Sequence, residues 1–146
     1  MQSVGYGDLV LRLAVAVIFG AIIGVDRELR GKAAGLRTFA LVSLGSSVFV
    51  LTATGPDTAT QADSISRVVQ GIVTGIGFLG AGAIIRGQTE ESVKGLTTAA
   101  SVWLAAAGGI ACGLAQWPLV IASSVFGVLI LVLDPVERWL KAHFAK

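Results

Sequence analysis

The sequence predicts an all-α membrane protein, a polytopic bundle of about five transmembrane helices. Hydrophobic residues make up 54% of its 146 residues, charged residues only 14%, and the mean hydropathy is +0.81. This apolar content is well above that of ordinary soluble domains. Because apolar runs and short connections occupy nearly the whole sequence, we expect a single transmembrane domain over residues 1–146.

The expected spans are 17 to 19 residues long, in the lower half of the ~17–25 residues that a helix needs to cross a bilayer. The only charge inside them is Arg12, which lies about one turn from the start of the first span and can extend to the headgroups. No basic leader with a small-residue cleavage site is present, so we interpret the first run as a retained span. The five spans cover residues 9–25, 38–55, 68–85, 96–114 and 117–133.

The third span combines an uncharged 18-residue run with five glycines. Small residues let helices approach closely in lipid, and glycine also lets a helix break where protein or a polar cavity covers the backbone. We therefore expect this span either to pack closely on another helix or to be broken at membrane depth. Its glycines are Gly71, Gly75, Gly77, Gly80 and Gly82.

A short repeat relates the starts of the second and fourth spans at an offset of 60 residues. Residues 35–40 read GLRTFA, and residues 95–100 read GLTTAA. Both copies open a span from the same side, which indicates a parallel two-helix repeat whose helix ends meet at one interface. The threonines could cap those ends. Chance is the alternative for so short a match. The residues concerned are Gly35, Thr38, Gly95, Thr97 and Thr98.

The C-terminal segment, residues 134–146, predicts a short amphipathic helix at the membrane surface. Asp134, Pro135 and Glu137 fit an N-cap, a first-turn proline and a third-position acid. Trp139 would lie at headgroup level with basic side chains beside it. We expect this helix to anchor the tail, and docking of a protein partner is the alternative.

The distribution of basic residues predicts the topology. Of the 11 Lys and Arg residues, nine lie in the first loop, the third loop and the tail, and the exceptions are Arg12 and Arg67. Since basic loops stay in the cytoplasm, the N-terminus is expected outside and the C-terminus inside. The net charge of +2 reflects this bias and does not indicate a nucleic-acid partner.

The first cytoplasmic loop holds the densest charge cluster of the chain. Asp26 with Arg30, and Glu28 with Lys32, are acid-before-base pairs four residues apart, which indicates solvated ion pairs worth about 0.3–0.5 kcal/mol each. The alternative is that Asp26, Glu28 and Arg37 bind or gate an ion. Mg²⁺ keeps several waters and takes one or two carboxylates, so Asp26 and Glu28 are the candidate metal ligands. The spacing alone favours ion pairs.

Other chemistry finds little support in the sequence. Cys112 and His143 are the only residues of their kinds, so one chain cannot assemble a His/Cys metal cluster or a Ser/His/Asp arrangement. Residues 75–80 fit G-x-G-x-x-G, but that pattern requires a strand, a turn and a helix in a soluble unit. We therefore expect no enzyme activity and no cofactor other than Mg²⁺ as a ligand or substrate.

Four ordered motifs resemble the MgtC/SapB family over essentially the whole chain: GVDRE at 24–28, GKAAGLRT at 31–38, GIGFLGAG at 75–82 and GLTTAA at 95–100. The resemblance implies a bacterial inner-membrane protein tied to growth in low magnesium and, in pathogens, to virulence. It also implies either Mg²⁺ transport or a regulator that binds a membrane partner such as ATP synthase or another transporter.

The resemblance also carries over to individual positions. Asp26 stands where a glutamate is expected, and the sequence ends soon after the fifth span, where longer members have a soluble domain. The positions that match the family pattern are Arg27, Glu28, Gly35, Arg37, Thr38, Arg67, Gly77, Gly80, Gly82, Gly95, Thr97 and Thr98.

Two functions therefore remain. In the first, a bundle that we expect to be oligomeric passes or binds a cation through Asp26, Glu28 and a broken third span. In the second, the polar cluster and the small-residue faces bind another membrane protein, and no ion crosses. The lack of acids at the centre of the spans favours interaction, whereas the glycine-rich span and the repeat favour transport.

Overall fold

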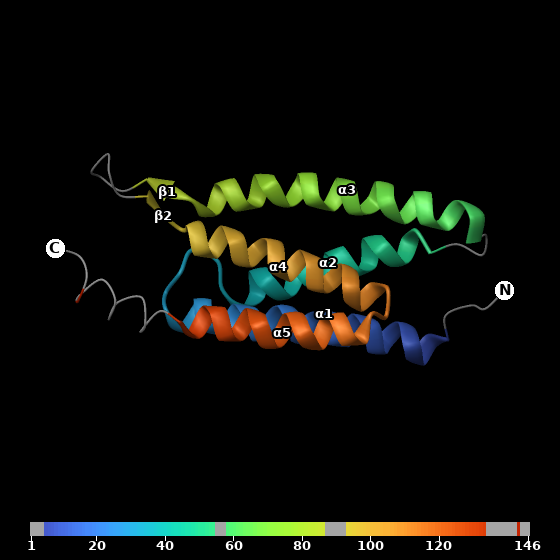
Figure 1. Cartoon of the computed structure of the whole chain (residues 1–146), viewed down its shortest axis with the longest axis horizontal. Coiled ribbons are helices and arrows are strands. Elements are labelled where there is room, and N and C mark those ends of the chain that lie inside the picture. The colour runs from blue at the N-terminus through green and yellow to red at the C-terminus, as the bar shows by residue number, and fades with distance from the viewer. Residues whose placement is uncertain (1–4, 55–57, 87–92, 134–142, 144–146) are drawn as a thin grey trace.

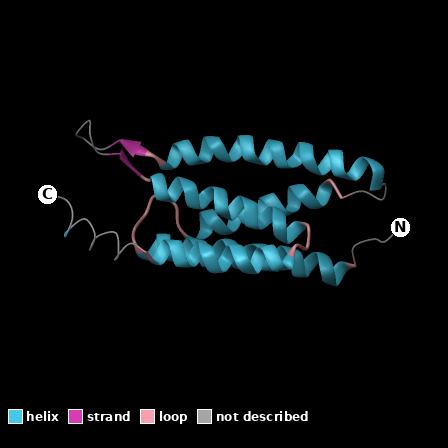
Figure 2. Cartoon of the chain, viewed as in Figure 1, coloured by secondary structure: helices cyan, strands magenta, loops and turns pink. Residues whose placement is uncertain are grey.

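The computed structural model describes residues 5–54, 58–86, 93–133 and 143. This part of the chain is an all-helical bundle with one very short antiparallel hairpin (Figures 1 and 2). The predicted amphipathic helix over 134–146 falls outside the described residues, apart from His143. The elements are α1 (Tyr6–Leu29), α2 (Leu36–Thr52), α3 (Thr58–Ala83), β1 (Ile85–Arg86), β2 (Val93–Lys94), α4 (Leu96–Gly113) and α5 (Trp117–Val132).

Successive helices run in opposite directions. Figure 1 shows that α1, α3 and α5 end where α2 and α4 begin, next to the β1–β2 hairpin. We call this end of the bundle the hairpin end. In the part of the chain that the structure describes, three helices are long and apolar enough to cross a membrane, namely Tyr6–Leu29, Thr60–Ala83 and Leu96–Gly113. The helices α2 and α5 are apolar but shorter, with 17 and 16 residues.

The expected third span is not broken. α3 is continuous from Thr58 to Ala83 and starts ten residues before the predicted boundary, because the polar segment ahead of the apolar run is helical too. An unbroken helix satisfies its own backbone groups, which lipid cannot do. α1 likewise runs four residues beyond its predicted end, so Asp26 and Glu28 lie in its last turn rather than in a loop.

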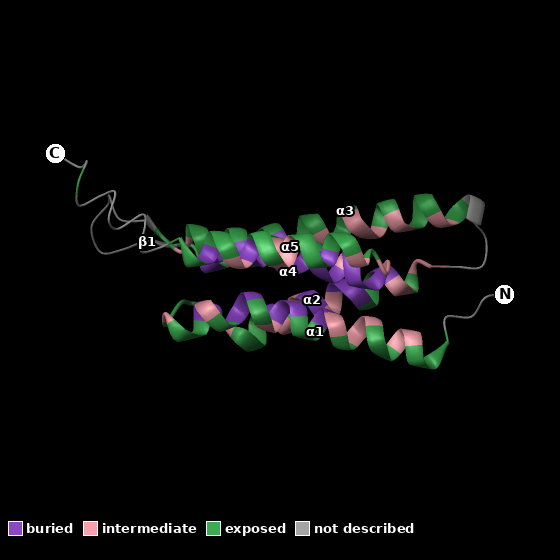
Figure 3. Ribbon diagram, turned by 60° about the horizontal axis from the view of Figure 1, so that its bottom comes forward, coloured by how far each residue is buried: buried purple, intermediate pink, exposed green. Residues whose placement is uncertain are grey.

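The core of the bundle is built from α1, α2 and α4, which pack on one another, while α5 covers α4 and α1. α4 is the most enclosed candidate span, with 61% of its apolar window buried, and α3 is the least, with 11%. Figure 3 shows the same contrast, since buried residues gather on α4 and α2 whereas α3 is mostly exposed or half-buried. α3 packs chiefly on α4.

Helices approach one another most closely at glycines of α1 and α4, not at those of α3. A Cβ on Gly20 of α1 would overlap the Phe39 carbonyl oxygen of α2, and one on Gly24 would lie 2.7 Å from the Cα of Leu36. In α4, a Cβ on Gly109 would overlap the Ser43 carbonyl oxygen. Such contacts bring helix backbones together as small residues do in membrane bundles.

The predicted internal repeat is supported by matching contacts. Gly20 lies against Phe39 in the first hairpin of helices. Sixty residues later, Gly80 lies near Ala99, the nearest atoms being 3.8 Å from a Cβ built on Gly80. The helices α2 and α4 both start at the hairpin end and pack on each other, as a parallel repeat requires.

Candidate polar site and glycine face

The polar cluster of the first loop centres on a buried arginine. Arg27 is only 1% exposed and is one of the largest fully buried side chains among the described residues. Its Nη2 and Nε donate to Oδ2 of Asp26 at 2.5 and 3.0 Å, and Nε of Arg30 donates to Oδ1 at 2.6 Å. The predicted pair of Asp26 and Arg30 is therefore present, and Asp26 bridges two guanidinium groups.

This bridge fixes what Asp26 can do. A guanidinium buried among apolar side chains needs a charged partner, because an isolated buried charge is strongly unfavourable. Both carboxylate oxygens of Asp26 are used by Arg27 and Arg30. Asp26 is thus the shared counterion of two guanidinium groups, and this geometry suits a structural ion pair.

The second candidate ligand, Glu28, caps the next helix. Its Oε2 accepts a hydrogen bond of 3.1 Å from the backbone N–H of Leu36, the first residue of α2. A carboxylate at a helix N-terminus satisfies an otherwise unpaired donor and complements the helix dipole. Gly35 makes this possible, since a Cβ there would overlap the Glu28 carboxylate. The cap comes from the preceding helix and not from Thr38, which is exposed.

The remaining predicted polar residues are not gathered into one site. Arg37 and Thr97 are exposed at the starts of α2 and α4, while Thr98 is 2% exposed. Arg67 is exposed on α3, about four helical turns from Ala83 and the hairpin end. Among the described residues, no three His, Cys, Asp or Glu side chains come together as a metal site.

Most glycines of the third span face open space within one chain. A Cβ on Gly71, Gly75, Gly77 or Gly82 would meet no atom within 4 Å, and only Gly80 has a neighbour. Their close packing on another helix of the same chain is therefore not found. On a helical wheel, Gly71, Gly75 and Gly82 fall within about 40° of one another. Phe78, 82% exposed, lies on the same face. We call these four residues the glycine face of α3.

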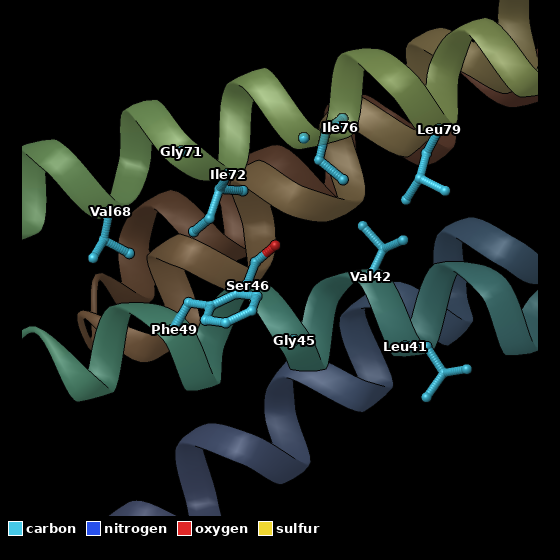
Figure 4. A pocket seen from close by; sticks show the side chains of 11 residues that line it. Leu41, Val42, Gly45, Ser46, Phe49, Val68, Gly71, Ile72, Ile76 and Leu79 are labelled. Carbon is cyan, nitrogen blue, oxygen red and sulfur yellow. The ribbon is translucent and has the colours of Figure 1, made fainter.

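An apolar groove lies between α2 and α3 and includes Gly71 and Gly75 of this face. It has a volume of about 630 Å³, and Ser46 supplies its only polar side chain. Figure 4 shows Val42 and Phe49 of α2 opposite Ile72 and Ile76 of α3 across it. The charged cluster of α1 does not line the groove. The lining residues are Leu41, Val42, Gly45, Ser46, Phe49, Val68, Gly71, Ile72, Gly75, Ile76 and Leu79.

At the other end of the bundle, Arg12 has two partners within the chain. Its Nη2 lies 2.6 Å from Oδ2 of Asp8, and its Nη1 donates to the Gly113 carbonyl oxygen at 2.9 Å. Gly113 is the last residue of α4, so a cation here complements the negative end of the helix dipole. The position of Arg12 near a span end predicts exposure, but its partner on α4 depends on the tertiary fold.

Comparison with known sequences identifies the family of the chain. The sequence model of the MgtC family matches residues 13–139, which is most of the chain. The chain belongs to the MgtC family. Like the apolar helices, this membership identifies a membrane protein. No solved structure matches this MgtC-family chain.

Several relatives align over most of the chain. SrpB of Synechococcus elongatus is 42% identical over 132 residues, which cover 84% of this chain and 72% of SrpB. MgtC of Salmonella typhimurium LT2 is 44% identical over 116 residues, 80% of this chain and 48% of that protein. YhiD of Escherichia coli K12, named as a candidate magnesium transporter, is 38% identical over 129 residues, 85% of this chain and 59% of YhiD. This chain thus spans about half the length of the Salmonella protein.

Proposed function

We propose that this MgtC-family protein is a magnesium-related regulator of the bacterial inner membrane that binds a transmembrane helix of a partner protein. The observation that carries the proposal is the glycine face of α3, which is apolar, unoccupied within the chain and located on the least buried candidate span. The link to magnesium comes from the name of the relative YhiD of Escherichia coli K12. The charge distribution favours an external N-terminus and a cytoplasmic C-terminus.

The geometry of the glycine face suits a helix. Gly71, Gly75 and Gly82 leave the backbone of α3 accessible, so a second helix can approach it closely enough for van der Waals contact along its length. Phe78 projects between two of these glycines and offers a large apolar side chain for the partner to enclose. The small residues allow a partner helix to pack closely on α3, and the single aromatic side chain fixes the position of the partner along α3.

The polar cluster supports the same assignment. The carboxylates of Asp26 and Glu28 hold Arg27, Arg30 and the start of α2, which are structural tasks. Transport of Mg²⁺ is the alternative, and it is favoured by the name of YhiD and by the parallel repeat. The two functions differ in whether an ion crosses the membrane.

A crosslinking experiment tests the proposed contact. A photo-crosslinking amino acid in place of Phe78 is expected to capture a membrane protein from cells grown in low magnesium. Gly75→Leu is expected to abolish this product, because the branched side chain would occupy the contact surface. Ala122→Leu is the matched control, since Ala122 is exposed on α5. A product formed only with a second copy of the chain would contradict a separate partner and indicate a homo-oligomer.

A flux measurement separates the two functions. Purified protein in liposomes that contain a Mg²⁺-sensitive dye is expected to give no more Mg²⁺ entry than liposomes without protein. Saturable entry above that of liposomes without protein would overturn the regulatory assignment and establish transport.

A further inference from the structure

A second pocket, of about 380 Å³, lies at the hairpin end and is formed by segments distant in sequence. The connection after α1 contributes Arg30 and Lys32, and the segment at the start of α4 contributes Lys94, Gly95 and Thr98. Gly31, Ala33 and Ala83 complete the lining. We call this cavity the hairpin-end pocket.

The charged side chains that line the hairpin-end pocket are all cationic. Arg30 is engaged with Asp26, but Lys32 and Lys94 are exposed and form no ion pair with the part of the chain that the structure describes. Within the described ranges, no acidic residue lines the pocket. Three cations around one cavity create a positive potential that attracts an anion.

The start of α4 adds backbone donors. The first helical hydrogen bond joins the N–H of Ala99 to the carbonyl of Gly95 at 2.8 Å, so the N–H groups of the preceding three residues have no acceptor four residues earlier. Gly95 adopts φ 95°, and a Cβ there would overlap the Ala83 carbonyl oxygen. The tight turn therefore places the positive end of the α4 dipole next to Lys94.

Thr98 is an independent sign that the pocket holds a ligand. Its side chain is 2% exposed and lines the hairpin-end pocket. Its hydroxyl forms no hydrogen bond with any described residue. The fully buried polar atoms without a partner in the described chain are on Arg12, Ser43 and Ser47, so the Thr98 oxygen is accessible from the pocket. Polar groups of such nearly buried side chains are mostly satisfied by protein, water or a ligand. A bound group with oxygen acceptors would satisfy the Thr98 hydroxyl.

We propose that the hairpin-end pocket binds a phosphate group, either from an anionic lipid headgroup or from free phosphate. The lysines neutralise its charge, while the first turn of α4 and the Thr98 hydroxyl donate hydrogen bonds to its oxygens. The pocket lies at the end of the membrane-spanning helices, where a headgroup phosphate and a dissolved one can both reach it. This proposal is independent of the partner assignment for α3.

Binding to the full chain in detergent micelles tests the proposal with two probes. Inorganic phosphate is measured by isothermal titration calorimetry, and phosphatidylglycerol by native mass spectrometry, with phosphatidylcholine, a zwitterionic lipid of zero net charge, as the comparison. Lys32→Gln and Lys94→Gln are each expected to weaken binding about tenfold, and Thr98→Val about fivefold. Thr98→Val keeps the side-chain shape. Arg37→Gln is the matched control, because it removes an exposed cation from the same end without touching the pocket.

The outcomes separate the two sources. Binding of inorganic phosphate that the three variants weaken identifies a site for free phosphate. Binding of phosphatidylglycerol alone, with the same response, identifies a headgroup site. If neither probe binds, or if the three variants bind as tightly as Arg37→Gln, the proposal is wrong.

Discussion

Gly109 of α4 lies directly against the backbone of Ser43 in α2, with no space between them for a side chain. Gly109→Leu is therefore expected to lower the free energy of unfolding by about 1–3 kcal/mol or more, because the two helices must separate. Unfolding in mixed micelles with increasing SDS measures the change. Gly77→Leu is the control, since Gly77 faces open space. Equal effects of the two variants would refute the close contact.

Substitution of a buried serine in the same interface is not expected to destabilise the fold. Ser43 and Ser47 are fully buried in α2, and their hydroxyls have no partner among the described residues. Ser47→Ala should leave the unfolding free energy unchanged or raise it by up to about 1 kcal/mol, because an unpaired buried hydroxyl is removed. Ser101→Ala is the comparison, since its hydroxyl donates to the Thr97 carbonyl at 2.7 Å. A larger loss for Ser47→Ala would show that its hydroxyl has a partner.

Removal of the Asp26 carboxylate should destabilise the fold strongly. Asp26→Ala leaves Arg27 buried without its partner, and we expect a loss of about 3–5 kcal/mol in the unfolding free energy. The double variant Asp26→Ala, Arg27→Leu should recover part of this loss, because the buried charge is removed as well. The same SDS titration measures both variants. An Asp26→Ala protein as stable as the parent would disprove the role of this ion pair.

The cap on α2 predicts a smaller effect that depends on the chemistry of residue 28. Glu28→Ala should cost about 1 kcal/mol, because the Leu36 N–H loses its acceptor. Glu28→Gln retains an amide oxygen and should cost less. Gly35→Ala should resemble Glu28→Ala, since a methyl group there displaces the carboxylate. Circular dichroism during thermal unfolding ranks the three variants, and indistinguishable Ala and Gln variants would argue against capping.

The proposed orientation can be mapped with single cysteines in a Cys112→Ala background. Tyr6→Cys should react with a membrane-impermeant maleimide in intact spheroplasts, whereas His143→Cys should react only after permeabilisation. Both positions are exposed. The reverse labelling pattern would contradict the inference from the basic loops.

The sequence predicts the helices well where hydrophobicity alone decides them. The fourth and fifth spans were expected at 96–114 and 117–133, and α4 and α5 end within one residue of these limits. The start of α3 was missed because its first residues are polar yet helical, and a hydropathy pattern detects only the part that suits lipid. Local ion pairs such as Asp26 with Arg30 can also be predicted from the sequence, since they depend on helical spacing.

Contacts between distant segments were not predictable in the same way. The high number of glycines predicts close packing for the third span, but the number of glycines in a helix does not show which face contacts another helix. Two pairs of closely packed glycines, Gly20 with Gly24 and Gly109 with Gly113, are spaced four apart, and this small-residue pattern is a sequence signal for the contacts. The burial of Arg27 and the cap on α2 by Glu28 arise only when α1 and α2 fold together.

The uneven distribution of close contacts has a mechanical consequence. Backbone-to-backbone contacts hold α1, α2 and α4 as a stiff unit, whereas α3 rests mainly on α4 and borders an open groove on its α2 side. A force on α3 can tilt it by compressing or widening that groove, while the stiff unit keeps its shape. The helix that offers its surface to the surroundings is thus also the compliant part of the molecule.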